Sequence, residues 1–286
     1  MLNKILLGYD GSSNCNDALK LSTNIANKYN SEINAITVLP DYKEFIKSYS
    51  ELDKKLFVHW VEDTLRIKQI KKLEKKKEQL GNKGIKFVYD VKYGLPYKEI
   101  LGEVKKENYN LIALGKGRFG NKSILGGTAK KVLKNTSVTV LISGANFKKN
   151  KFKKILVPTD IYNVMKKDLS FAQELADKFN SQIYLLNIIE KGNHKYPVEM
   201  IETLKGNSYD TLSQNLLKDK NMNDVEPRVK VAQNSWLGIN NFIEEENIDL
   251  VVMMSYGGDK IRSEFLGSVT EKVIEHSPCP VIALSP

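Results

Sequence analysis

Residues 250–284 read LVVMMSYGGDKIRSEFLGSVTEKVIEHSPCPVIAL, and this stretch predicts the fold of the chain. It begins with the apolar run Leu250–Met254, which is short and β-branched enough for a buried strand. After a polar loop with glycines, Val269 and Val273 recur at helical spacing. Two prolines end that helix, and residues 281–284 are typical of a last strand. The order is strand, loop, helix, strand.

The glycine loop in this stretch is a candidate phosphate site. A loop that runs from the carboxyl end of a buried strand into a helix presents free backbone N–H groups, and the helix dipole favours negative charge. Gly257 and Gly267 allow the backbone to approach a ligand closely, and Ser268 adds a hydroxyl group. Taken alone, the loop is equally compatible with a tight turn in which Ser268 caps the helix.

Composition indicates a folded protein with room for about two domains. The chain has 286 residues, 41% of them apolar and 27% charged, which excludes a disordered class. No apolar run reaches the about 18 to 20 residues that span a bilayer, and the start reaches Asp10 too soon for a signal peptide. Cys15 and Cys279 lack metal-ligand spacing, which favours free thiols in a reducing compartment. A cytoplasmic location is the resulting expectation.

The formal charge of +10, from 44 Lys and Arg against 34 Asp and Glu, raises the question of nucleic-acid binding. Much of the excess lies in residues 66–86, where Leu65, Ile67, Ile70 and Leu73 recur near helical spacing. The lysines there are therefore expected on the solvated face of an amphipathic helix. No nucleic-acid-binding motif accompanies the charge, so nucleic acid is not favoured as a partner.

An internal repeat divides the chain into two halves. Residues 4–10 (KILLGYD) match residues 154–160 (KILVPTD) at a shift of 150 positions. Residues 125–133 match residues 266–274 at a shift of 141, because the second half is shorter in its middle. The repeat predicts a domain over 1–146, a polar linker over 147–153 and a second domain over 154–286.

Each half alternates strands with helices, which predicts a Rossmann-like, doubly wound α/β domain with a five-stranded parallel sheet flanked by helices. The expected strands of the first half are 5–9, 33–39, 86–91, the run before Gly115, and 138–142, with helices at about 14–29 and 97–107. Those of the second half are 155–159, 183–189, 228–232, 250–254 and 281–284, with helices at about 165–179 and 238–246. The repeated fifth strands are expected to pair the halves as an intramolecular pseudo-dimer.

Two variable regions, 40–79 and 190–223, are where the halves differ most. The first is rich in large apolar side chains, and a helix packing on its own sheet is favoured over a partner surface there. These side chains are Tyr42, Phe45, Tyr49, Leu56, Phe57 and Trp60.

Both halves resemble the universal stress protein domain, and the resemblance covers nearly the whole chain. In nucleotide-binding members of that family, the first strand ends in an Asp that contacts adenine. A Gly-x2-Gly-x9-Gly-(Ser/Thr) loop after the fourth strand wraps the ribose and phosphates. The resemblance thus implies a site for ATP or another adenine nucleotide, with or without Mg²⁺. It also implies possible pairing of protomers through the fifth strand, and so a homodimer.

The second half matches this pattern closely. Val157-Pro158-Thr159-Asp160 stands at the first strand end, and nine residues separate Gly257 from Gly267-Ser268. Met254 stands where the first glycine of the loop belongs, and it either crowds the ribose or is tolerated because only the strand backbone is used. The implied nucleotide-binding residues are Pro158, Thr159, Asp160, Ile188, Met253, Met254, Gly257, Gly267, Ser268, Val269 and Thr270.

The first half departs further. Gly115 to Gly126 spans 11 positions where Met254 to Gly267 spans 13, and Gly127 replaces the serine. The second half is therefore the better predicted site. The corresponding residues of the first half are Gly8, Tyr9, Asp10, Val38, Gly115, Gly117, Gly126, Gly127 and Thr128.

Simpler roles exist for several of these groups. Asp10 and Asp160 each stand at a strand-to-helix junction, where a carboxylate caps the following helix. The cations of the two loops either neutralise phosphates or are merely solvated. They are Lys116, Arg118, Lys122, Lys260 and Arg262.

No catalytic residue and no metal site is predicted. There is no Walker A motif and no Gly-x-Ser-x-Gly elbow, and the three histidines lack ligand spacing. At most, slow hydrolysis of bound ATP is expected. The leading hypothesis is a cytoplasmic stress-response protein whose adenine nucleotide modulates contacts with a protein partner that the sequence does not identify. The alternatives are a nucleotide-independent scaffold with decayed sites and a weak ATPase.

Overall fold

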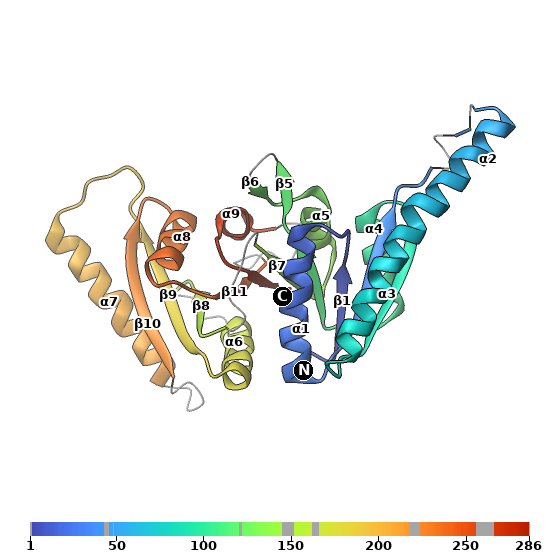
Figure 1. Ribbon diagram of the computed structural model, residues 1–286. Helices are drawn as coiled ribbons and strands as arrows, with labels where there is room; N and C mark the ends of the chain where they lie inside the picture. The colour runs from blue at the N-terminus through green and yellow to red at the C-terminus, as the bar shows by residue number, and fades with distance from the viewer. Residues whose placement is uncertain are drawn as a thin grey trace.

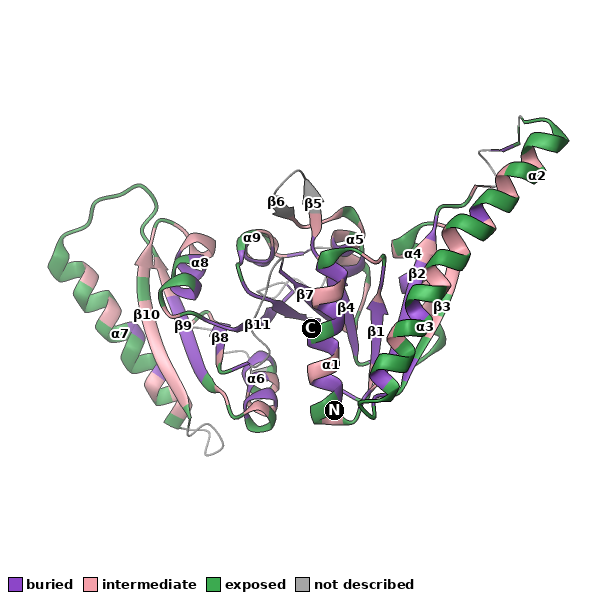
Figure 2. Cartoon of the chain, viewed as in Figure 1, coloured by how far each residue is buried: buried purple, intermediate pink, exposed green. Residues whose placement is uncertain are grey.

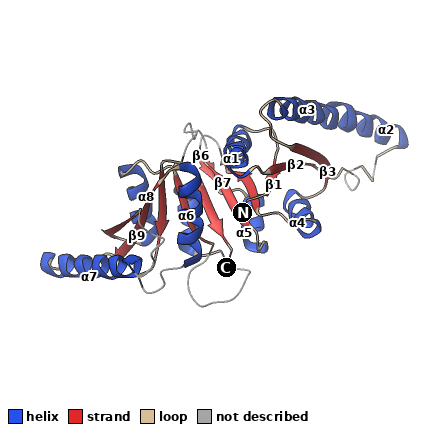
Figure 3. Ribbon diagram, turned by 90° about the horizontal axis from the view of Figure 1, so that it is seen from below, coloured by secondary structure: helices blue, strands red, loops and turns tan. Residues whose placement is uncertain are grey.

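The computed structural model describes residues 2–42, 46–47, 49–119, 122–144, 152–161, 166–217, 224–255 and 266–285. Within these ranges, ten strands form one sheet in the order β10-β9-β8-β11-β12-β7-β4-β1-β2-β3 (Figure 1). Helices cover both faces of this sheet (Figure 3). No described helix combines the length and apolar content needed to cross a membrane.

The first half contributes five parallel strands in the order β3-β2-β1-β4-β7. Its strands are β1 Lys4–Gly8, β2 Glu32–Leu39, β3 Phe87–Tyr93, β4 Leu111–Gly115 and β7 Thr139–Ser143. Its helices are α1 Ser13–Tyr29, α2 Glu51–Trp60, a π-helical segment Val61–Arg66, α3 Ile67–Gly81, α4 Pro96–Lys106 and α5 Gly127–Asn135. A separate hairpin pairs β5 Gly117–Phe119 with β6 Lys122–Ile124.

The second half repeats the arrangement as β10-β9-β8-β11-β12, again all parallel. Its strands are β8 Lys154–Pro158, β9 Gln182–Glu190, β10 Val225–Ala232, β11 Leu250–Met254 and β12 Val281–Leu284. Its helices are α6 Lys166–Phe179, α7 Val198–Leu217, α8 Ser235–Glu245 and α9 Ser268–His276. The doubly wound fold with two repeated units that the repeat predicts is confirmed.

Central strands are continuous apolar runs because helices cover them on both sides. The side chains of β11 are all buried, as are the three middle residues of β1 and of β8. The turns repeat as well. Asn30 and Asn180 follow α1 and α6 in the left-handed conformation, both with φ 54°, which Asn tolerates better than most residues.

The halves meet through their fifth strands, because β12 pairs antiparallel with β7. Helices α1 and α6 also touch across this junction. Lys28 lies over the ring of Phe179 at 5.9 Å, and Lys178 lies over the ring of Tyr29 at 5.7 Å. Since a shift of 150 turns the first pair into the second, the two halves are related by a near two-fold rotation.

The α2–α3 region departs most from the expected packing. Leu73 and Leu80 of α3 are buried and α3 packs against β3, as a helix on its own sheet should. In contrast, α2 has no buried residue and extends past the end of the sheet (Figures 1 and 2). Tyr42 joins its base to β3 through edge contacts with Phe57 at 6.1 Å and Tyr93 at 5.5 Å. Phe45 lies outside the described residues.

Candidate functional site

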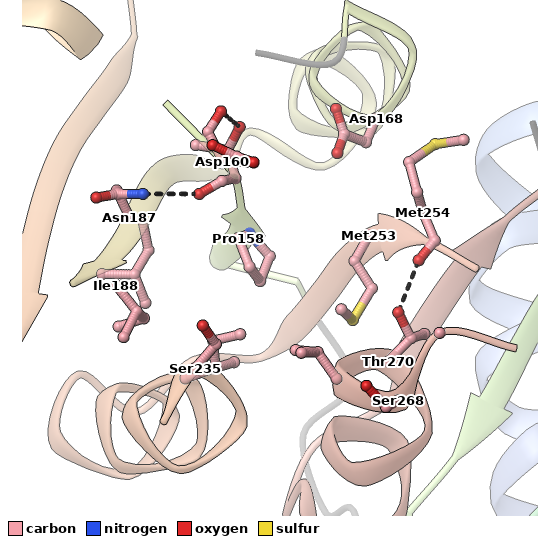
Figure 4. Close-up of a pocket in the computed structure, with 15 residues that line it drawn as sticks. Pro158, Asp160, Asp168, Asn187, Ile188, Ser235, Met253, Met254, Ser268 and Thr270 are labelled. Carbon is pink, nitrogen blue, oxygen red and sulfur yellow. Dashed lines mark hydrogen bonds between the residues drawn. The ribbon is translucent and has the colours of Figure 1, made fainter. Parts of the chain in front are cut away.

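A cavity of about 470 Å³ opens at the carboxyl ends of β8 and β11 (Figure 4). Such an edge, where the strand order reverses, is where open α/β sheets hold ligands. Ten of the eleven residues predicted for the second half line it: Pro158, Thr159, Asp160, Ile188, Met253, Met254, Gly267, Ser268, Val269 and Thr270. The eleventh, Gly257, lies outside the described residues.

One wall of the cavity is the end of β8. The Thr159 N–H donates to the Leu186 carbonyl at 2.8 Å, and the Asn187 amide donates to the Thr159 carbonyl at 3.1 Å. These bonds from β9 hold the backbone that carries Asp160.

The first half has an equivalent hydrogen bond from its second strand to the end of its first strand. Thr37, which aligns with Asn187 at the shift of 150, donates its hydroxyl to the Tyr9 carbonyl at 2.6 Å. Sequence reasoning missed both residues. Their signal was a polar side chain at the same place within two mainly apolar strands.

The opposite wall is the first turn of α9. Its N-cap is Gly267, and no side chain caps the turn. The Thr270 hydroxyl donates to the Met254 carbonyl at 3.0 Å, which anchors the turn to the end of β11. By comparison, Ser12 caps α1 and Asn234 caps α8 with side-chain oxygens. The N-terminus of α9 therefore keeps its positive end open to the cavity.

Met254 does not crowd this turn. Its side chain points toward Asp168 and α6, away from Ser268, whereas the Met253 side chain points toward the side of Ser268 (Figure 4). At the equivalent position of the first half, a Cβ on Gly115 would lie 2.7 Å from the Asn14 backbone, so only glycine fits there. Both sequence-based alternatives for Met254 concern a bound ribose, and they stay predictions.

Asp168, on α6, is a lining residue that sequence reasoning missed. Its side chain is buried, with 4% of the residue exposed, and burial raises the pKa of its carboxyl to about 6. One oxygen accepts the Leu169 N–H at 2.8 Å, which offsets part of that rise in pKa. Ala18 stands at this position in the first half. The carboxyl thus distinguishes the two cavities.

The cavity of the first half is smaller, about 220 Å³. All nine residues predicted there line it: Gly8, Tyr9, Asp10, Val38, Gly115, Gly117, Gly126, Gly127 and Thr128. The shortened loop folds into the β5–β6 hairpin, which was not predicted and which brings Gly117 against Gly126. A Cβ on Gly117 would lie 3.0 Å from the Gly126 Cα, so the two glycines approach closely where they line this cavity.

Asp10 organises the entrance to α1. Its carboxylate accepts the Ser12 N–H at 2.8 Å. Burial alone would raise the pKa of Asp10, but hydrogen bonds from Ser12 and Cys15 outweigh it and lower that pKa. Burial, together with the neighbouring Asp10, raises the pKa of the Cys15 thiol to about 12, so this cysteine stays protonated. The N-cap of α1 is Ser12, so Asp10 orders the turn before the helix and does not itself cap it, contrary to the capping role considered for it.

Lys116 is neither a solvated loop cation nor directed at a ligand. Only 4% of the residue is exposed, and its ammonium donates to the carbonyl of Ser277 at 2.7 Å and of Glu275 at 3.4 Å. Burial lowers its pKa to about 8, although nearby acidic groups oppose the shift. A cation from the first-half loop thus holds the C-terminal end of α9 in the second half.

The structure does not test whether the other four loop cations face a ligand or solvent. The side chains of Arg118 and Lys122 are not described, and Lys260 and Arg262 lie outside the described ranges. In the described part of the chain, no group of three or more His, Cys, Asp or Glu side chains is arranged to hold a metal ion.

Comparisons with known proteins agree with this architecture. The model of the universal stress protein family matches residues 1–143 and again residues 151–285. A universal stress protein of Methanocaldococcus jannaschii is 26% identical over 149 residues, which cover 47% of this chain and 83% of that protein. Another, of Bacillus subtilis, is 29% identical over 149 residues, covering 50% of this chain and 99% of that protein.

A solved structure shares the fold over the full length. The crystal structure of a universal stress protein from Archaeoglobus fulgidus superposes with a TM-score of 0.71 at 22% identity, covering 100% of this chain and 99% of that one. The double match of the family model shows that the chain belongs to the universal stress protein family and carries its domain twice.

Proposed function

We propose that this protein is a stress-response module that binds ATP or another adenine nucleotide in the cavity of its second half. The observation that carries the proposal is the convergence of Asp160, Ile188 and the uncapped first turn of α9 on one cavity. Its volume of about 470 Å³ falls within the roughly 300–1,000 Å³ of small-molecule sites, and the 220 Å³ of the first-half cavity falls below that range.

The chemistry of the cavity suits an adenine nucleotide. The Asp160 carboxylate is an acceptor for the exocyclic amine of adenine, and Ile188 offers an apolar surface for the ring. Free N–H groups and the helix dipole at Ser268 and Val269 favour phosphate. The hydroxyl of Ser268 is a further donor. Mg²⁺ commonly arrives on nucleotide phosphates with several of its waters, so binding it does not require a protein cage.

Binding is proposed to act through interactions and not through a reaction. A ligand changes the equilibrium between protein states only by its differential affinity for them. The cavity walls belong to different elements, β8 and β9 on one side and β11 and α9 on the other. A nucleotide that contacts both walls adds its own surface at this edge of the sheet, which a partner protein can recognise.

Calorimetric titration of nucleotide-free protein with ATP, ADP and AMP tests the proposal. We expect Asp160→Ala to weaken binding at least about tenfold, because a buried ligand amine loses its acceptor. Asp10→Ala is the matched control in the smaller cavity and is expected to leave that binding unchanged. Equal affinities for wild type and Asp160→Ala would refute the proposed site.

A second candidate function is a scaffold that acts without nucleotide. The small first-half cavity, where the shortened loop forms the β5–β6 pair, is the observation that favours it. A ligand that binds only the folded state must raise apparent stability. A melting temperature unchanged by millimolar ATP would favour the scaffold, and a rise would favour nucleotide binding.

A further inference from the structure

Exposed apolar side chains gather on two segments of the molecule. Among the described residues, 13 large hydrophobic side chains are exposed, and 11 of them lie within residues 49–67 or 196–217. These ranges contain α2 and the start of α3 in the first half, and α7 in the second. Both connect the second strand of their half to the third, so the two segments are equivalent. Single exposed apolar residues are ordinary, but such a concentration marks an interaction surface.

The first segment, together with the rest of α3, is here named the arm and comprises residues 49–81. Leu52, Leu56 and Trp60 recur every four residues along α2 and form one stripe. Leu56 is 61% exposed and Trp60 is 50% exposed, whereas Val61 is buried on the side that faces the molecule. Farther along the arm, α3 carries six lysines against two glutamates. The arm thus combines an outward apolar stripe with a basic stem.

The second segment has the opposite charge. On α7, Met200 and Leu204 are exposed one turn apart, while Ser208 and Leu212 face the sheet. This helix carries three acidic residues against one lysine. The contrast extends to the halves: residues 1–146 contain 26 Lys and Arg against 15 Asp and Glu, and residues 154–286 contain 14 against 19.

One chain cannot join these two surfaces to each other. The arm packs against β3 and α7 packs against β10, and these strands form the two edges of the ten-stranded sheet (Figure 1). We propose that the arm of one copy docks on α7 of a second copy, head to tail. This contact buries both apolar surfaces and sets the basic stem against the acidic half.

Two other occupants fit the observations less well. Packing of two arms against each other would bring two basic stems together and leave α7 uncovered. Nucleic acid would meet the lysines of α3 but would leave Leu52, Leu56 and Trp60 in water. A second copy both pairs the opposite charges and buries the apolar stripe. A heterologous contact of this kind either closes as a ring of copies or extends as an open chain of copies.

Sedimentation velocity over a range of protein concentrations tests the contact. We expect Leu56→Asp on the arm and Leu204→Asp on α7 each to raise the concentration of half-association at least about tenfold. The control is Leu95→Asp, which is 53% exposed but lies outside both segments, at the N-cap of α4, where Asp is well tolerated. It is expected to associate like wild type. Circular dichroism confirms that each variant is folded.

Mixing the two defective variants tests the direction of docking. Leu56→Asp keeps an intact α7 and Leu204→Asp keeps an intact arm, so an equimolar mixture should form a 1:1 complex that neither variant forms alone. Raising the salt concentration should weaken this complex, because its charges are opposite.

Three results would overturn the proposal. One is a wild-type protein that stays monomeric at all concentrations tested. Another is normal association of Leu204→Asp, which would indicate arm-to-arm packing. The third is loss of the wild-type assembly on nuclease treatment, which would assign the basic stem to nucleic acid.

Discussion

Asp168 is the residue whose ionisation most distinguishes the second-half cavity. Its pKa is raised by burial from 3.8 to about 6, so the folded protein retains a proton that the unfolded chain loses between about pH 4 and pH 6. Stability contributed at this site is therefore greatest at acidic pH, falls as pH rises through that window, and stays low above it.

Asp168→Asn should remove this dependence. We expect the variant to be more stable than wild type at pH 7.5, by on the order of 1–2 kcal/mol, and to differ little at pH 4.5. Urea midpoints at the two pH values measure the effect. Asp177→Asn, an exposed change on the same helix, is the control and should show no such gain. An equal effect of Asp168→Asn at both pH values would contradict the assignment.

The contacts of Lys116 could not be predicted from the residues next to it in the sequence. Its loop position suggested a phosphate ligand or a solvated charge, but the carbonyl that it binds belongs to Ser277, 161 positions away. Lys116→Ala leaves that carbonyl and the Glu275 carbonyl without this buried donor. We expect a loss of about 1–3 kcal/mol in the free energy of unfolding, measured by urea denaturation. Lys105→Ala, an exposed change, should be near neutral, and a similar result for Lys116→Ala would disprove the role.

At the scale of elements, α8 lies close to β9 because Gly238 lacks a side chain. A Cβ there would lie 2.9 Å from the Ile188 side chain and 2.8 Å from Ala232. Gly238→Ala should therefore displace Ile188 from the cavity, cost about 1–3 kcal/mol of stability and weaken ATP binding. Gly206→Ala on α7 is the control, because a Cβ there meets nothing within 4 Å and alanine favours helix. Equal effects of the two changes, by thermal melting and titration, would argue against this packing.

Elements with strong periodicity were predictable, and those created by tertiary contacts were not. Strands such as β8 and β11 are continuous apolar runs between helices, so their pattern survives in the sequence. The β5 strand has only three residues, Gly117–Phe119, and depends on its partner β6. The composition of the π-helical segment Val61–Arg66 does not differ from that of an ordinary α-helix, so the sequence did not indicate it.

The residues of the candidate cavities likewise divide into those that the sequence could predict and those that it could not. Asp160 and the loop glycines were predictable because the repeat and the family spacing mark them. Asn187 and Asp168 were missed, because their roles follow from a carbonyl and a cavity that exist only in the folded chain.

At the scale of the whole molecule, the two halves carry opposite charges at an equivalent position of their junction. Lys130 on α5 pairs with Glu271 on α9, and the shift of 141 makes these the same position in the two halves. In a symmetric pair of identical domains, this position would face a copy of itself. The ion pair therefore requires two different halves, and it favours their association within one chain.

Exchanging these charges tests the junction. Lys130→Glu should lower the melting temperature by placing two carboxylates together, and adding Glu271→Lys should restore it. Raising the salt concentration should shrink the difference, because the pair is partly exposed. A double variant no more stable than Lys130→Glu alone would show that the pair does not couple the halves.

The central claim is that the second-half cavity holds an adenine nucleotide. A crystal structure of the full chain grown with millimolar ATP and Mg²⁺ tests it most directly. The account predicts adenine density beside Asp160 and Ile188 and phosphate density at the N-terminus of α9, with the first-half cavity less occupied. An empty second-half cavity, or nucleotide bound only beside Asp10, would contradict it.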